Sequence, residues 1–316
     1  MKFLYGGTLS DEDRERLQDA APSAVIESVE DRDEALQAIT DAEAYVPGPW
    51  DAELLAAASA LRWVQFRSAG VGRRLLPELE GADILITNAS GVYGVPMAEH
   101  ALALMFAFSR GLNVLARAEG GWRESRKKVG SSLRELNGAT LGILGYGGVG
   151  RATAQRGAAL GMRVLAVRRR PEPDEFADEV WGTDRLDDML READYLLVSC
   201  ALTDETRGII GARELELMKP TAVVVNVARG AVIDEEALTE ALRHGAIAGA
   251  GLDVAEEEPL PDDSPLWRMK NVIITPHCSG ASPKTHERLM GLIAENLGRY
   301  AAGEPLLNVV DLEAGY

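Results

Sequence analysis

The chain has 316 residues, enough for two domains of ordinary size, and its 46% hydrophobic content excludes a disordered or low-complexity protein. Its formal net charge of −17 at pH 7 argues against nucleic acid and membrane as partners, since that field repels both polyanions and anionic lipid. Two cysteines, Cys200 and Cys278, are too few for a disulfide framework or a thiolate metal site, so we expect no metal.

The N-terminal part alternates short strands and helices. Apolar runs predict strands at residues 2–5, 25–26, 44–46, 63–66 and 84–86. Ser10 to Asp13 resembles a capping box that opens a helix, and Asp51 is expected to cap a helix over residues 52–60. We therefore predict a small doubly wound domain over residues 1–93, which residues 285–316 complete.

A long apolar stretch follows, and it predicts one helix over residues 95–120. The stretch is apolar around most of its circumference, so the helix should be buried on several sides, at a domain junction or in a homodimer interface. Neither residues 101–108, the longest apolar run, nor the start of the chain at residues 1–7 matches a membrane span or a signal peptide. We therefore expect a cytoplasmic protein.

A second series of strands predicts a larger domain over residues 94–284. The six expected strands lie at residues 141–144, 163–167, 195–199, 222–227, 248–253 and 272–275. Strands alternating with helices indicate the α/β class with a doubly wound parallel sheet, here a Rossmann dinucleotide-binding domain. A helix is expected over residues 283–300, and residues 308–310 are expected to return to the first domain.

A phosphate-binding turn is predicted where the first of these strands ends. Gly145, Tyr146, Gly147, Gly148, Val149 and Gly150 fit the pattern G-x-G-x-x-G between an apolar strand and a helix. Gly145 permits the tight turn, Gly147 lets the backbone approach a pyrophosphate, and Gly150 lets the helix pack closely on the strand. The helix N-terminus then offers free N–H groups to the phosphates.

The next strand ends in Arg168, Arg169 and Arg170, where an NAD site usually has a carboxylate for the ribose hydroxyls. Positive charge at this place suits the 2′-phosphate of NADP, so we expect NADP to be preferred and NAD to be possible. An alternative is that arginine is simply abundant, because the chain has 27 Arg and only six Lys. A halophilic source and a GC-rich coding bias both account for that composition.

Three polar residues follow the ends of predicted strands in the larger domain: Arg229, Glu258 and His277. Ligands of open α/β sheets bind outside the carboxyl ends of the strands, so these three are candidate catalytic residues. Each taken alone would ordinarily be a surface or structural residue. Their shared position beside a dinucleotide turn favours a functional role.

These segments resemble the signature sequences of the D-isomer-specific 2-hydroxyacid dehydrogenase family. The resemblance rests on residues 226–230, 251–254, 258–260 and 275–277, and it extends over residues 63–71, 95–104, 141–161 and 202–208. It implies an NAD(P)-dependent oxidoreductase, similar to glyoxylate and hydroxypyruvate reductases, with two domains and a cleft between them. It also implies a homodimer formed through the region of residues 95–120.

The resemblance assigns a role to each matching residue. Arg229 would bind the carboxylate and keto oxygen of a small 2-keto acid, His277 would exchange the proton, and Glu258 would pair with His277 and stabilise its protonated form. Backbone N–H groups of Ser68, Ala69, Gly70 and Val71 would hold the substrate carboxylate, and Asp253 would contact the nicotinamide carboxamide. The remaining expected cofactor contacts are Cys200, Ala201, Thr206, Val227, Ala228, Ser279 and Gly280.

Two other functions fit the same sequence. Phosphite and formate dehydrogenases share this fold, although the set of Arg229, Glu258 and His277 favours hydroxy acids. A dinucleotide-sensing protein of the corepressor type would keep the same three residues without turning over a substrate. Cys278 beside His277 suggests a thiol nucleophile, but hydride transfer needs none, and we interpret it as a wall residue.

Overall fold

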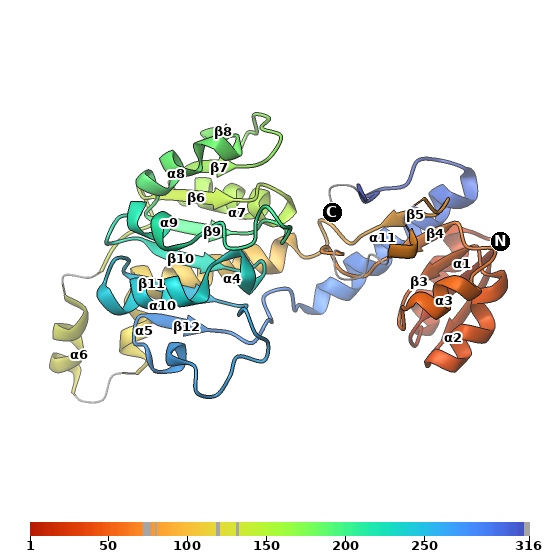
Figure 1. Ribbon diagram of the computed structural model, residues 1–316, viewed down its shortest axis with the longest axis horizontal. Coiled ribbons are helices and arrows are strands. Elements are labelled where there is room, and N and C mark those ends of the chain that lie inside the picture. Colours follow the sequence, from red (N-terminus) through yellow and green to blue (C-terminus); the bar gives the residue numbers. More distant parts are fainter. Residues whose placement is uncertain (72–76, 80, 118–120, 131–132, 313–316) are drawn as a thin grey trace. The chain divides into compact units, whose positions relative to one another are not determined.

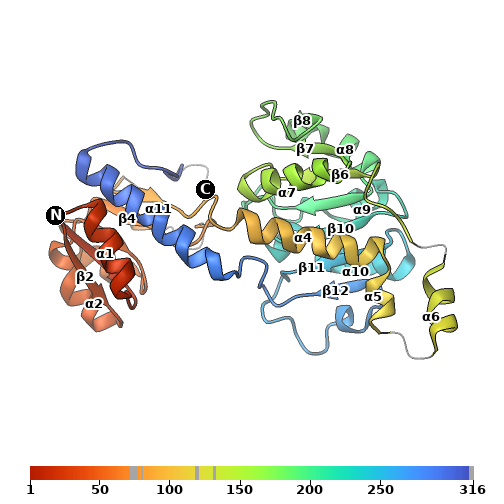
Figure 2. The same cartoon turned by 180° about the vertical axis from the view of Figure 1, so that it is seen from behind.

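A computed structural model describes residues 1–71, 77–79, 81–117, 121–130 and 133–312. The chain forms two compact units: unit 1 comprises Met1–Tyr93 and Ser282–Tyr316, and unit 2 comprises Gly94–Ala281. None of the helices in the described ranges combines the length and apolar character that crossing a membrane requires. Figures 1 and 2 show the units from opposite sides, and each is described by itself below.

Unit 1 is built on a five-stranded parallel sheet of order β2-β1-β3-β4-β5. Its strands are β1 (Lys2–Gly6), β2 (Val25–Val29), β3 (Ala44–Val46), β4 (Trp63–Gln65) and β5 (Leu85–Thr87). Its helices are α1 (Asp11–Ala20), α2 (Arg32–Ala38), α3 (Ala52–Ala57) and α11 (Pro283–Ala302). The predicted caps are confirmed, since Ser10 and Asp51 accept hydrogen bonds from the first turns of α1 and α3.

Each face of this sheet carries its own apolar core. Helices α2 and α3 cover one face together with Ile39 and Leu54, and α1 and α11 cover the other with Leu17 and Ile293. Figure 2 shows α1 and α11 lying side by side over the sheet. After α11 the chain returns to the sheet edge as expected, because Val309 forms an antiparallel bridge with Thr87 of β5.

Unit 2 is built on a seven-stranded parallel sheet of order β12-β11-β10-β9-β6-β7-β8. Its strands are β6 (Thr140–Leu144), β7 (Arg163–Val167), β8 (Glu179–Trp181), β9 (Tyr195–Val198), β10 (Val223–Asn226), β11 (Gly249–Leu252) and β12 (Val272–Ile274). This order is the Rossmann order with one added strand, and β6 and β9 meet where the order reverses. The edge strand β8 is absent from the six strands predicted above.

Helices cover both faces of this sheet. One face carries α4 (Gly94–Ser109) and α7 (Gly148–Ala159), which enclose one core cluster with Leu141 and Val225. The other carries α8 (Leu186–Glu192), α9 (Ala212–Leu217) and α10 (Glu235–His244), which enclose a second cluster with Leu196 and Val224. Figure 1 shows α8, α9 and α10 in front, and Figure 2 shows α4 and α7 in front.

The predicted single helix over residues 95–120 is wrong. Helix α4 ends at Ser109, and a separate short helix, α5 (Leu112–Leu115), begins after Gly111; residues 118–120 lie outside the described residues. Gly111 adopts a left-handed conformation with φ of 66°, and a Cβ at this position would lie 2.9 Å from Val129. Val129 ends the next helix, α6 (Trp122–Val129), so tertiary packing sets the break.

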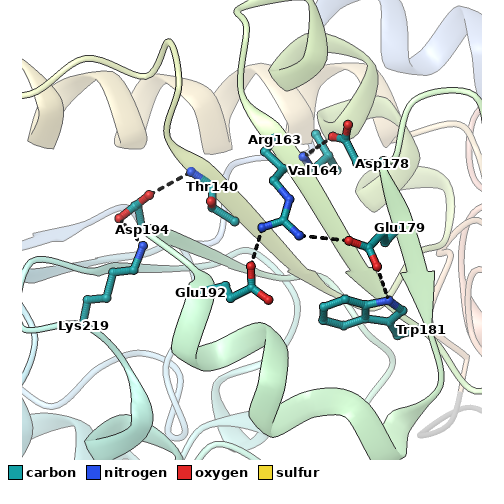
Figure 3. Close-up of polar contacts among 9 residues, drawn as sticks. All are labelled: Thr140, Arg163, Val164, Asp178, Glu179, Trp181, Glu192, Asp194 and Lys219. Carbon is teal, nitrogen blue, oxygen red and sulfur yellow. Dashed lines mark hydrogen bonds and ion pairs between the residues drawn. The ribbon is translucent and has the colours of Figure 1, made fainter.

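Polar side chains hold together the amino ends of the strands in unit 2, at the edge opposite the candidate site (Figure 3). Arg163 at the start of β7 pairs with Glu192 of α8 and with Glu179 of β8. Asp194 accepts a hydrogen bond from the Thr140 N–H at 2.8 Å and pairs with Lys219. The short edge strand β8 is thus anchored by a side chain of its neighbour as well as by backbone pairing.

Candidate active site

The three candidate catalytic residues follow three neighbouring strands of unit 2. In the parallel register Asn226 of β10 is level with Leu252 of β11, which is level with Ile274 of β12. Arg229, Glu258 and His277 lie on the loops that follow these strands, so all three loops leave from the same edge of the sheet. This is the edge at which open α/β sheets bind their ligands.

His277 and Glu258 form a direct pair, with Nδ1 of His277 2.7 Å from Oε2 of Glu258. The other carboxylate oxygen of Glu258 accepts a hydrogen bond from the Ala255 N–H at 3.2 Å. His277 and Glu258 are 49% and 38% exposed, so solvent reaches the pair. Because Nδ1 is engaged by Glu258, the Nε2 atom of His277 is the one that can exchange a proton with a ligand.

Arg229 belongs to a loop that packs against the loop of Glu258. A Cβ on Gly230 would lie 1.9 Å from the carbonyl carbon of Ala255, so only glycine permits this close approach. The side chain of Asn226 fixes the turn, since it accepts from the Ala228 N–H and donates to the Arg229 carbonyl. Among described residues the Arg229 guanidinium donates only to the Ala228 carbonyl, at 2.6 Å, and it is exposed.

A buried carboxylate, Asp253, anchors the loop that carries His277. Its side chain is fully buried and accepts hydrogen bonds from Thr275 Oγ1 at 2.7 Å, Cys278 N–H at 3.0 Å and Ser279 N–H at 2.9 Å. Its backbone carbonyl also accepts from the His277 N–H at 2.8 Å. Burial alone would raise the pKa of Asp253, but hydrogen bonds from Ser279, Thr275 and Cys278 lower the pKa overall. The predicted contact of Asp253 with the nicotinamide remains a prediction.

His100 of α4 extends this network, and it is not among the site residues predicted from the sequence. Its Nε2 atom lies 2.9 Å from Thr275 Oγ1. The single hydroxyl hydrogen of Thr275 is donated to the ionised Asp253, so the His100 Nε2 must carry a proton and donate it to Thr275. The sequence offers only a weak signal here, because His100 and the adjacent Glu99 are polar residues within a largely apolar helix.

The predicted phosphate turn has the geometry that a dinucleotide requires. Gly145 has a φ of 96°, and a Cβ there would lie 2.3 Å from the Cys200 backbone nitrogen. A Cβ on Gly150 would lie 2.5 Å from the Gly145 carbonyl oxygen, whereas one on Gly147 would meet no atom within 4 Å. Helix α7 begins at Gly148 without a side-chain cap, so its first N–H groups remain available. The turn therefore fits a bound pyrophosphate.

The three arginines follow β7, whose last residue, Val167, is level with Leu144 at the start of this turn, and they are partly or fully exposed. A carboxylate does return to the turn: Asp174 accepts from the Tyr146 hydroxyl at 2.9 Å and from Arg151 Nε at 2.7 Å. The Arg151 guanidinium neutralises the Asp174 carboxylate, and the Tyr146 hydroxyl donates to it. Burial alone would raise the pKa of Asp174, but these hydrogen bonds lower it overall. Asp174 is therefore committed to Tyr146 and Arg151.

The other expected cofactor residues lie around the ends of β9, β10 and β12. Thr206 Oγ1 donates to the Ala201 carbonyl at 2.7 Å, which closes the loop after β9. Val227, Ala228 and Ser279 are buried, and Gly280 is half-buried. Burial raises the pKa of Cys200 to about 11, and burial and Asp253 raise that of Cys278, so both thiols stay protonated at neutral pH.

The expected substrate segment belongs to unit 1 and follows β4. The Ser68 carbonyl accepts from the Ala89 N–H at 3.0 Å, Ala69 and Gly70 are exposed, and Val71 is buried. The N–H groups of Ala69, Gly70 and Val71 donate to no described residue. Three adjacent donors without an acceptor among the described residues fit a carboxylate ligand. Within the described part of the chain, no His, Cys, Asp or Glu side chains are grouped so as to hold a metal ion.

Comparisons with known proteins agree with this geometry. The family model for the NAD-binding domain of D-isomer-specific 2-hydroxyacid dehydrogenases matches residues 102–279. The glyoxylate reductase of Korarchaeum cryptofilum is 37% identical over 304 residues, which is 94% of this chain and 89% of that protein. The glyoxylate reductase of Aeropyrum pernix is 40% identical over 272 residues, 83% of this chain and 80% of that protein.

Two solved structures have the same fold over the whole chain. A D-isomer-specific 2-hydroxyacid dehydrogenase from Xanthobacter autotrophicus, in complex with NADPH and MES, has a TM-score of 0.84 and 29% identity, covering 100% of this chain and 99% of that one. An NADPH-dependent glyoxylate/hydroxypyruvate reductase from Sinorhizobium meliloti, in complex with NADP and sulfate, has a TM-score of 0.83 and 27% identity over the same shares. The chain belongs to the D-isomer-specific 2-hydroxyacid dehydrogenase family, and it is an oxidoreductase that interconverts 2-keto and 2-hydroxy acids with a nicotinamide dinucleotide.

Proposed function

We propose that this oxidoreductase is an NADPH-preferring reductase of small 2-keto acids such as glyoxylate and hydroxypyruvate. The observation that carries the proposal is the hydrogen-bonded pair of His277 and Glu258. The loop of Glu258 also packs against the loop that carries Arg229. The names of the similar glyoxylate reductases support the substrate class, and the NADPH and NADP complexes among similar structures support the cofactor.

In this proposal Arg229 binds the carboxylate and the keto oxygen of the substrate, because a guanidinium presents two parallel donors. Nε2 of His277 gives its proton to the keto oxygen, while Glu258 stabilises the protonated imidazole through Nδ1. The N–H groups of residues 69–71 bind the substrate carboxylate. NADPH, when bound, would supply a hydride to the keto carbon; with the proton from His277 on the keto oxygen, the product would be the D-2-hydroxy acid.

The cofactor would be held by the turn at Gly145 to Gly150, with the pyrophosphate at the start of α7. Arg168, Arg169 and Arg170 would face the 2′-phosphate of NADP. A charge-assisted hydrogen bond contributes about 1.5–3 kcal/mol, and 1.4 kcal/mol corresponds to tenfold. We therefore expect kcat/KM to be at least about tenfold higher with NADPH than with NADH, and we expect added salt to reduce this preference because the arginines are partly or fully exposed.

Loss of absorbance at 340 nm with each cofactor and a panel of 2-keto acids tests the proposal directly. Arg168→Asp should move the preference toward NADH, because a carboxylate accepts from the ribose hydroxyls and repels the phosphate. Arg185→Asp is the matched control, because Arg185 lies in the same unit but its guanidinium stacks on the Trp181 ring. Equal kinetics with both cofactors in the unmodified enzyme would contradict the NADP preference, and tight cofactor binding without any turnover would favour a sensor.

A homodimer formed through α4 and α5 is also part of the proposal. These two helices leave large apolar side chains at the surface of the isolated chain, namely Phe106 and Leu112. Exposed apolar side chains on neighbouring helices are typical of an interface.

A further inference from the structure

The loop between β7 and β8 brings a carboxylate back to the glycine turn. Asp174 accepts from the hydroxyl of Tyr146 at 2.9 Å, and Tyr146 is the first variable residue of the G-x-G-x-x-G pattern. Burial and the Asp174 carboxylate raise the pKa of Tyr146, whereas the charge of Arg168 opposes the rise, so both charged groups act on the same hydroxyl. A negative and a positive side chain therefore lie on the two sides of Tyr146.

Arg151 of α7 covers this carboxylate. Its Nε atom donates to Asp174 at 2.7 Å, and its Nη2 atom donates to Glu175 at 3.0 Å. The guanidinium carbon lies 4.6 Å from the centre of the Phe176 ring, so a cation–π contact adds to the two ion pairs. Three consecutive residues of the loop thus fix one guanidinium, and they hold its charge against Asp174.

The neutralisation of Asp174 has a consequence for cofactor choice. A carboxylate near the glycine turn is the feature by which an NAD site accepts from the ribose hydroxyls, and its charge repels a 2′-phosphate. The chain as a whole carries a net charge of −17, which adds to that repulsion. With Arg151 on one oxygen and Tyr146 on the other, Asp174 has neither a free charge nor a free position for the ribose.

We propose that Arg151 makes the cofactor site selective for a 2′-phosphate by neutralising Asp174. The inference rests on the proposed function, in which the arginines after β7 face that phosphate. Arg151 acts through Asp174, so it is a positioning residue and the arginines after β7 remain the groups that bind the phosphate. Without Arg151, Asp174 would give the site the carboxylate that is typical of an NAD site.

Binding of two cofactor fragments tests the inference without turnover. Titration calorimetry of the protein gives the Kd of 2′,5′-ADP and of 5′-AMP, and only the first carries a 2′-phosphate. Arg151→Met should lower the preference for 2′,5′-ADP about three- to tenfold, the size of a charge–charge interaction that solvent partly screens. Arg151→Lys keeps the charge and should keep the preference. Asp174→Asn should raise it, because Arg151 then has one counter-charge fewer.

A double variant separates electrostatics from support of the loop. Arg151→Met with Asp174→Asn should recover the preference of the unmodified protein, whereas Arg151→Met with Glu175→Gln should not, because Glu175 contacts Arg151 and not Tyr146. Arg163→Met is the matched control, since Arg163 also pairs with two glutamates but at the opposite edge of the sheet (Figure 3). Loss of preference in both single variants without recovery in the double variant would mean that the pair only supports the loop, and would overturn the inference.

The ratio of kcat/KM with NADPH to kcat/KM with NADH separates this inference from the proposed function. If the unmodified enzyme shows no preference for NADPH, the proposed cofactor is wrong, yet a shift of the ratio toward NADH in Arg151→Met still supports the role of Arg151. A preference for NADPH that is unchanged in Arg151→Met, with unchanged binding of 2′,5′-ADP, would overturn the inference alone.

Discussion

At the scale of single residues, His277 has an unusual backbone. Its φ of 51° lies in the left-handed region, which residues other than glycine adopt infrequently. The Asp253 carbonyl accepts from its N–H, and the Asp253 carboxylate accepts from the next two N–H groups. The imidazole is thus held by backbone anchors on one side and by Glu258 on the other.

Replacing His277 should remove the proton donor while leaving the binding groups in place. We expect His277→Ala to lower kcat about 10²- to 10⁴-fold with a smaller change in KM. His244→Ala is the matched control, since His244 also pairs with a glutamate, at 3.2 Å, but lies on the surface of α10. Steady-state kinetics of keto acid reduction measures both variants, and a kcat near that of the unmodified enzyme would remove His277 from the mechanism.

The Glu258 carboxylate should hold the His277 ring in place for proton transfer. Glu258→Gln keeps a side-chain oxygen near Nδ1 but removes the charge from the 2.7 Å contact. We expect this variant to lower kcat, by less than His277→Ala does, with Glu257→Gln as the control. Steady-state kinetics equal to those of the unmodified enzyme would show that the contact has no role in catalysis.

At the scale of elements, the loop from Thr275 to Ser279 depends on one buried carboxylate. Because the pKa of Asp253 is lowered in the folded protein, its ionised form stabilises the fold above the ordinary pKa of aspartate, and this contribution disappears as the pH falls through the lowered value. We expect Asp253→Asn to reduce the free energy of unfolding by about 2–4 kcal/mol at pH 7, since it weakens several hydrogen bonds to a charged group. Urea denaturation at pH 7 and at decreasing pH should show the difference shrinking only below about pH 4. A difference that stays constant with pH would contradict this role.

The buried strands and the loops that follow them were predictable, because continuous runs such as residues 223–226 read as strands between turn residues. The break at Gly111 was not, since a glycine costs a helix only about 1 kcal/mol and the break depends on packing against Val129. Strand β8 has a half-buried face and no long apolar run. The role of His100 was not predictable, because a polar residue near the start of a helix ordinarily faces solvent and only tertiary packing places its Nε2 atom against Thr275.

At the scale of the whole molecule, the proposed dimer predicts a change of mass. Phe106 is 39% exposed and Leu112 is 51% exposed in the isolated chain. We expect light scattering after size exclusion to give twice the chain mass of 34.0 kDa, and Phe106→Glu with Leu112→Asp to give the monomer. Val25→Asp is the control, because Val25 is exposed at 64% but lies in unit 1. A monomeric unmodified protein would contradict the proposed interface.

Unit 1 is assembled from both ends of the chain, and this has a consequence for the order of synthesis. Phe3 and Trp63 belong to a core that α11 closes with Met290, Ile293 and Leu297. All of unit 2, Gly94–Ala281, is synthesised before those residues are made. The domain that begins first is therefore completed last, and one apolar face of its sheet lacks part of its cover until the whole nucleotide-binding domain has been synthesised.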